Sequence, residues 1–200
     1  MSDADLGQAL PLPVPSAEMQ ARLAVRRSAP AQALTGPGPS RAEIERILQL
    51  GARTPDHGKL FPWRFVVMGP ESRAVLAERL LPHAARQADP VKARNVLSKL
   101  TAPPLSILVV STPVGGHKVP VWEQQLSAGA ACMNLEHAAN ALGYSASWIT
   151  DWYSYDPQAV ELLGLVPGEQ VAGFIHVGTL AEPPLERPRP DMAAKVDYRS

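Results

Sequence analysis

The segment from Gln124 to Leu142 is the feature that most restricts how this chain can fold. It is rich in alanine, is apolar on most sides of a helical projection, and is followed by Gly143, the residue type that commonly closes helices. A helix that is apolar on most sides is stable only when other parts of a protein surround it. We therefore expect this helix in the middle of the molecule or at a contact between subunits.

Other apolar segments predict a buried sheet. Residues 104–112 (PLSILVVST) form a continuous apolar run, which is typical of a strand covered on both faces. Residues 63–68 (WRFVVM) are rich in aromatic and β-branched side chains and stop at a Gly-Pro pair, which also predicts a strand. Residues 147–150 and 171–179 are two further strand candidates.

The remaining regular patterns are helical. Ser40 and Glu43 form a capping box in front of an apolar stripe, so residues 41–52 are predicted to be an amphipathic helix. Ser16 can cap a shorter helix that carries Met19 and Leu23 on one face. Two further helices are expected over residues 72–86 and 157–163. Helices and strands alternate irregularly, which favours an α+β or α/β sandwich with few tight hairpins.

The two ends of the chain differ from its middle. Residues 1–15 contain prolines without helical periodicity and are predicted to be a flexible leader. The proline-rich residues 181–200 also lack apolar periodicity, so we expect them to run extended over a surface. Residues 16–180 then form one domain, for which 200 residues give sufficient length.

Charge and composition exclude several partners and locations. Lysine plus arginine number 19 and equal aspartate plus glutamate, so no charge excess favours nucleic acid or an anionic membrane. The single cysteine, Cys132, cannot form an intramolecular disulfide. The N-terminus lacks a signal-peptide pattern, and no apolar stretch reaches the length of a membrane span. We expect a soluble protein of the cytoplasm.

Several common chemistries lack their sequence signatures. No G-x-G-x-x-G follows a strand and no P-loop motif occurs, which disfavours Rossmann and P-loop nucleotide sites. A G-x-S-x-G elbow and an H-E-x-x-H motif are also missing, and the five histidines are scattered, so simple hydrolases and zinc sites are disfavoured.

Three polar clusters remain. Residues 26–28 (Arg-Arg-Ser) follow a helix and could bind a phosphate, although taken alone cations at a helix C-terminus more commonly complement the helix dipole. The loop over residues 51–63 could line a pocket with Arg53 and His57, while its Trp63 is more readily explained as core. Residues 117–123 could form part of a pocket or a solvated helix cap, and the sequence favours neither.

Taken together, four ordered blocks resemble the nitroreductase superfamily, and within it the compact YdjA-like NAD(P)H nitroreductases. The resemblance runs from about residue 18 to residue 180. Its blocks are residues 26–28, residues 52–65 (ARTPDHGKLFPWRF), residues 117–124 (HKVPVWEQ) with 127–131 (SAGAA), and residues 173–179 (GFIHVGT).

The resemblance implies an α+β fold with a central mixed sheet flanked by helices, in an interlocked homodimer with FMN in two interface clefts. The tail would embrace the partner protomer, and residues 138–143 would approach the nicotinamide nucleotide, although helix packing explains them as well. The implied cofactor-binding residues are Arg26, Arg27, Ser28, Arg53 and His57 (the last two possibly from the other protomer) and Trp148, Ile149 and Thr150.

Two positions depart from the family pattern. Pro30 stands where many relatives have a basic residue facing the flavin, and Ile149 stands where the nearest relatives carry an arginine. Arg187 or Arg189 in the tail is a candidate to replace the missing cation.

The resemblance also implies an activity, which is ping-pong transfer of hydride from NAD(P)H through FMN to small nitroaromatic or quinone acceptors. The flavin would supply the chemistry, so no side chain is named as catalytic. The alternatives are another FMN reaction on this fold (enone reduction, dehalogenation or flavin destruction) and a flavin-binding or redox-sensing module with little turnover.

Overall fold

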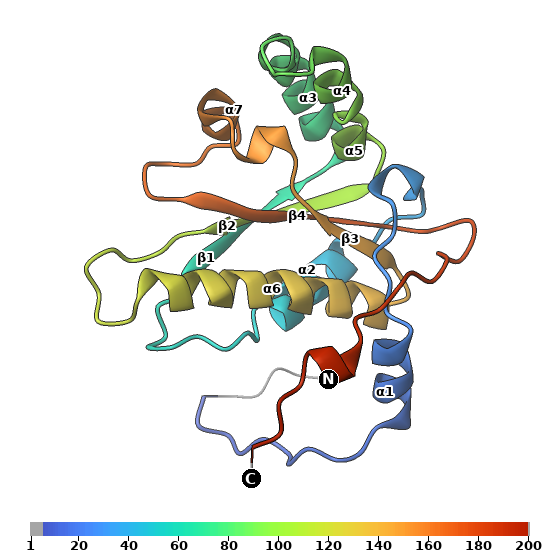
Figure 1. The fold of residues 1–200 in the computed structure, drawn as a ribbon, viewed down its shortest axis with the longest axis vertical. Helices are drawn as coiled ribbons and strands as arrows, with labels where there is room; N and C mark the ends of the chain where they lie inside the picture. The colour runs from blue at the N-terminus through green and yellow to red at the C-terminus, as the bar shows by residue number, and fades with distance from the viewer. Residues whose placement is uncertain (1–5, 200) are drawn as a thin grey trace.

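A four-stranded sheet forms the centre of the molecule (Figure 1). The structure, a computed structural model, describes residues 6–199. Within these residues the strand order is β1-β2-β4-β3 and each neighbouring pair is antiparallel. The strands are β1 (Trp63–Met68), β2 (Leu105–Ser111), β3 (Ser145–Ile149) and β4 (Gln170–Gly178).

The expected mixed sheet is therefore wrong for the described residues, although the α+β class is confirmed. A single helix between adjacent strands usually produces a parallel pair. Here three helices separate β1 from β2, and they return the chain to the end of the sheet at which β1 finished. They are α3 (Pro70–Ala84), α4 (Pro90–Asn95) and α5 (Ser98–Thr101), of which only α3 was predicted.

Helices cover both faces of the sheet, which explains why every residue of β2 is buried. One face packs against α2 (Arg41–Gly51) and α6 (Val121–Ala141), and the predicted capping box is present at Ser40. The other face packs against α3, α5 and α7 (Pro157–Leu162), and α4 packs on α3. Figure 1 shows these two helical layers on opposite sides of the strands. Short 3-10 turns complete the fold: η1 (Ala31–Ala33), η2 (Trp152–Ser154) and η3 (Met192–Ala194).

The long apolar helix α6 lies centrally, as its composition predicts. Nine of its residues are buried, and it packs against α2 and three of the strands. It begins at Val121, three residues earlier than expected, because Pro120 precedes a first turn that the sequence pattern does not distinguish from a loop. Trp122 and Leu126 on this helix are 66% and 52% exposed, so part of its apolar surface is uncovered in a single chain.

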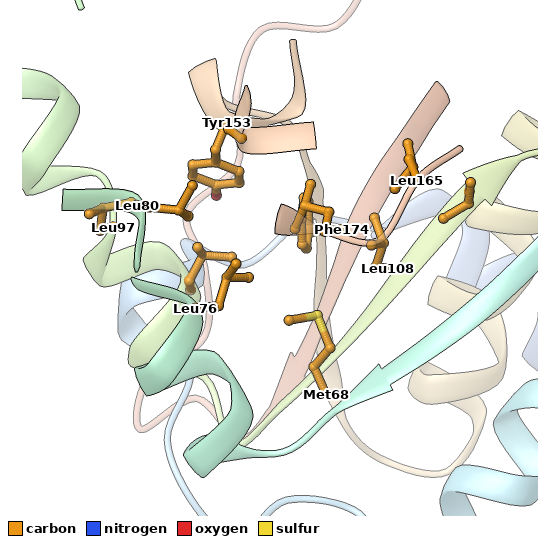
Figure 2. Packing of buried hydrophobic residues seen from close by; sticks show 12 residues of the cluster. Met68, Leu76, Leu80, Leu97, Leu108, Tyr153, Leu165 and Phe174 are labelled. Atoms are coloured by element: carbon orange, nitrogen blue, oxygen red, sulfur yellow. The ribbon is translucent and has the colours of Figure 1, made fainter. Parts of the chain in front are cut away.

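The core on the α3 side is built around aromatic rings. Figure 2 shows Tyr153 and Phe174 pointing toward each other between the sheet and α3. Their ring centroids are 5.4 Å apart in an edge-to-face arrangement, which is a favourable geometry for aromatic pairs. Leucines of α3 and of the segment before α5 close the cluster around them.

Two polar side chains, Ser106 and His176, lie side by side on neighbouring strands of the sheet. Ser106 on β2 lies opposite both Met68 on β1 and His176 on β4, and the Ser106 hydroxyl is 2.6 Å from Nδ1 of His176. Burial, with the charges of Arg73 and Lys99, lowers the pKa of His176 to about 3. His176 is therefore neutral in the folded protein at ordinary pH.

The N-terminal helix and the tail lie side by side outside the two layers (Figure 1). Helix α1 (Ala17–Ala24) is capped by Ser16 as predicted, but it has no buried residue. The described part of the leader, residues 6–15, is exposed and contains no helix or strand, while residues 1–5 lie outside the described chain. No helix within residues 6–199 is long and apolar enough to cross a membrane.

Candidate functional site

The segment Arg26-Arg27-Ser28 is held between helix α1 and strand β3. Helix α1 ends at Ala24, and the backbone N–H of Ala29 donates a 2.9 Å hydrogen bond to the carbonyl of Ala146 on β3. All three residues of the segment are partly buried. The sheet edge thus fixes the place from which both guanidinium groups extend.

Two neighbouring cavities surround these arginines. One, of about 240 Å³, lies between the segment, the end of α6 and the tail, and no carboxylate is among its described lining residues. The other, of about 310 Å³, lies between α1 and α6 and includes His137. Arg22, Arg26 and Asn140 line both cavities, and Arg27 lines the smaller one. Three guanidinium groups around one open cavity can bind a phosphate or another anion through charge-assisted hydrogen bonds.

Each arginine has a different internal acceptor. Arg22 pairs with Glu18 and also donates to the Asn140 carbonyl. Arg26 approaches the carboxylate of Glu136 with its Nη1 at 3.4 Å. Arg27 donates from Nε to the Leu185 carbonyl of the tail at 3.1 Å. These contacts orient the three side chains before any ligand is present.

Glu136 was missed by the sequence reasoning because an acid in an alanine-rich helix does not change the helical pattern. Its side chain is only 4% exposed, and burial raises the pKa of its carboxyl group while the charge of Arg26 opposes that shift. The pKa of the neighbouring His137 is lowered by burial and by the same arginine. The adjacent pair Glu136-His137, two titratable residues within an apolar segment, was the available signal.

Trp148 and Ile149 are the last two residues of β3, the strand that bonds to the arginine segment, and Thr150 follows them. Trp148 is 37% exposed, donates from Nε1 to the Ala172 carbonyl at 3.1 Å, and covers Gly173, where any Cβ would clash with its ring. Ile149 ends the strand, and the hydroxyl of Thr150 lies 2.8 Å from that of Tyr155. The strand was predicted two residues too late at its start and one residue too long at its end.

Arg53 and His57 lie against α6 at two different places along the helix. The Arg53 carbonyl accepts from Asn134 on α6, and His57 Nδ1 is 2.7 Å from the carboxylate of Glu123 in the first turn of α6. Glu123 and Glu136 are about 20 Å apart along the helix at its usual rise. One protomer therefore does not bring His57 together with Arg26.

Other predicted positions have structural roles. Trp63 is partly buried and packs on Phe65, as a core residue would. Pro30 is exposed and precedes η1. Arg189 donates to the Arg26 carbonyl at 3.0 Å, so this tail arginine lies at the arginine segment.

The fold and the site together define an α+β protein with a cationic cavity beside an edge strand, and comparison with known proteins gives that class a name. Residues 23–179 match the model of the nitroreductase family. The chain belongs to the nitroreductase family of oxidoreductases.

Individual relatives agree with this assignment. The Escherichia coli K12 protein YdjA, which is named as an NAD(P)H nitroreductase by assignment, is 35% identical to this chain. The alignment covers 77% of this chain and 84% of YdjA. A Haemophilus influenzae protein named for the same activity is 36% identical over 73% and 80%. Among solved structures, a nitroreductase-like protein from Bacillus cereus aligns with a TM-score of 0.80 at 20% identity, covering 94% of this chain and 99% of its own. A Bacteroides fragilis nitroreductase with bound FMN aligns at 0.73 and 20% identity, covering 92% and 100%.

Proposed function

We propose that this protein is an FMN-dependent oxidoreductase that uses NAD(P)H to reduce small nitroaromatic or quinone-like acceptors. Family membership supports the reaction class, and the names of the relatives support NAD(P)H as electron donor. The FMN-bound structure of the Bacteroides fragilis protein, which has the same fold, supports the cofactor.

The observation that carries the proposal is the arginine-lined cavity beside β3. FMN has a phosphate at one end and a flat ring system at the other. Arg22, Arg26 and Arg27 around a cavity without a lining carboxylate fit the phosphate. The backbone of β3 starts next to this cavity and leads away from it through Trp148, Ile149 and Thr150, in the direction that a ring system attached to the phosphate could follow.

The residues then have binding roles and no chemical ones. Bound FMN would supply the hydride chemistry itself. Arg26, Arg27 and Ser28 would hold the phosphate and ribityl part, and Trp148, Ile149 and Thr150 would border the ring. In a ping-pong sequence the oxidised nicotinamide would leave before the acceptor enters, so the space beside Trp148, Ile149 and Thr150 would serve both molecules in turn.

We further propose that the working unit is a homodimer whose partner supplies Arg53 and His57 to the site and receives the tail over residues 181–200. Leu185 and Arg189 of the tail also contact residues 26 and 27 of their own chain, so both protomers would hold the tail. Met19 and Leu23 on α1 are 62% and 48% exposed, as are the apolar residues of α6 described above, and large uncovered apolar patches mark interaction sites. Light scattering at micromolar concentration is expected to give twice the chain mass of 21.5 kDa. A stable FMN-loaded monomer would overturn this arrangement.

A turnover measurement separates an enzyme from a flavin-binding or redox-sensing module, an alternative that the family departures at Pro30 and Ile149 favour. The protein purified with its flavin, identified by mass after release, is mixed with NADH or NADPH and a quinone or nitroaromatic. We expect many turnovers per FMN. Reduction of the bound flavin without continued NAD(P)H oxidation would support the binding module. Turnover only with enones or halogenated aromatics would support another FMN reaction.

The cytoplasm remains our proposed location, because the one cysteine of the chain is free and buried and no cysteine pair calls for an oxidising compartment.

A further inference from the structure

The carboxylate of Glu136 lies at a buried position where an apolar side chain would have a smaller free-energy cost of burial. The residue is buried on α6, and its neighbours one turn away on either side, Cys132 and Ala139, belong to the apolar core. A buried carboxylate is costly unless it is paired and hydrogen-bonded. Among the described residues its Oε2 has one charged partner, Arg26, and its Oε1 has no hydrogen-bond partner. The backbone N–H of Trp148 on β3 also favours the charged form and lowers the pKa of Glu136, but it adds no charge to balance the carboxylate. The stability of α6 alone does not account for it.

The contact of Glu136 with Arg26 orients the guanidinium group of Arg26. Glu136 contacts Nη1 of the guanidinium group, while no acceptor for Nε or Nη2 exists within the described chain. The backbone carbonyl of Arg26 is held separately by Arg189. One edge of the guanidinium is thus fixed against α6, and the remaining donors belong to a side chain that lines both cavities.

Arg27 provides a contrast within the same segment. Its guanidinium donates to two backbone carbonyls, those of Leu185 and Ser28, and pairs with no carboxylate of residues 6–199. Tail and local backbone orient Arg27, whereas a charged residue from the central helix orients Arg26.

We propose that Glu136 is a positioning residue for Arg26, which holds the guanidinium in the orientation that binds the phosphate of FMN. This inference rests on the proposed function. Glu136 itself would not contact the phosphate, because two anions would repel one another. Its effect would pass through the guanidinium, as outer residues orient the direct ligands in metal sites.

The test is an affinity comparison with apoprotein, read by fluorescence titration with FMN and with riboflavin, which lacks the phosphate. Glu136→Leu is expected to weaken FMN on the order of tenfold, the lower part of the range for residues that orient direct ligands. Riboflavin affinity should be unchanged. Glu136→Gln keeps an acceptor oxygen for Arg26 and should restore most of the FMN affinity. Glu169→Gln, which removes a carboxylate paired with Arg64 elsewhere, is the matched control and should leave both affinities unchanged.

A double-mutant cycle separates this inference from the proposed function. If Glu136 acts through Arg26, Glu136→Leu should weaken FMN no further in an Arg26→Ala background. The positioning role would be overturned if the two substitutions weakened FMN binding additively. It would also be overturned if a Glu136 variant weakened riboflavin as much as FMN, or if either Glu136 variant bound FMN more tightly than wild type. If Arg26→Ala alone leaves FMN affinity unchanged, the phosphate assignment itself fails, and that outcome is distinct from a failure of Glu136 alone.

Discussion

Replacing Arg26 with alanine is expected to weaken FMN binding by roughly tenfold to a hundredfold. A hydrogen bond to a charged group contributes about 1.5 to 3 kcal/mol, which corresponds to that change in affinity. Arg26 combines a partly exposed guanidinium, a fixed orientation against Glu136 and a place in both cavities. Fluorescence titration of apoprotein with FMN measures the loss directly.

Riboflavin affinity should barely respond to Arg26→Ala, because the ring and ribityl chain keep their contacts. Arg41→Ala serves as the control for loss of a surface arginine, since that side chain is 88% exposed and, among the described residues, pairs only with Glu45 on its own helix. If Arg26 merely complemented the end of α1, its removal would lower stability by a few tenths to about 1 kcal/mol and leave FMN affinity unchanged. The urea midpoints of the wild-type and Arg26→Ala apoproteins, together with their FMN affinities, decide between these results.

Folding stability is expected to fall as the pH is lowered from about 7 toward 4, and His176 should account for a large share of the loss. The folded-state pKa of about 3 lies below the value of 6.5 for an unperturbed histidine, so the unfolded chain binds a proton that the folded chain does not. The contribution of His176 is therefore present above pH 6.5 and is lost as the pH falls from that value toward 3. Within this window the slope approaches about 1.4 kcal/mol per pH unit.

Urea unfolding of wild type and His176→Gln at several pH values measures this slope. Carboxylates with lowered pKa, such as Asp156 and Glu169, also reduce stability in acid, and the lowered pKa of His137 acts in the same direction as that of His176. These groups remain in both proteins, so the difference between the two curves isolates His176. Parallel curves would show that His176 has the same pKa in the folded and unfolded states, which would contradict this prediction.

Local pattern was sufficient to predict most of the elements. The capping box at Ser40, the continuous apolar run of β2 and the alanine-rich α6 each carry a strong periodic or compositional signal, and all three are present. The short helices α4 and α5 were missed because a single turn or two leaves no apolar stripe to detect. The mixed sheet that the resemblance implied was also wrong for the described residues, and strand direction itself leaves no local signature in the sequence.

The candidate site was only partly accessible to sequence reasoning. The cluster at residues 26–28 was recognisable from adjacent charges, and the structure places it at a cationic cavity. Its contacts with Glu136 and Arg189 join residues more than a hundred positions apart, which periodicity cannot reveal. The distance between His57 and Arg26 along α6 likewise appears only in three dimensions.

The contacts of the tail with residues 26 and 27 have a thermodynamic consequence. Leu185 and Arg189 attach to the same two residues whose side chains line the smaller cavity, so the order of the tail and the occupancy of that cavity are linked. Such linkage is reciprocal: a ligand that favours this arrangement of the arginines also favours the docked tail, by the same free energy with which the docked tail favours the ligand. The segment around Leu185 and Arg189 is therefore expected to report binding, and its resistance to a protease should rise with ligand saturation.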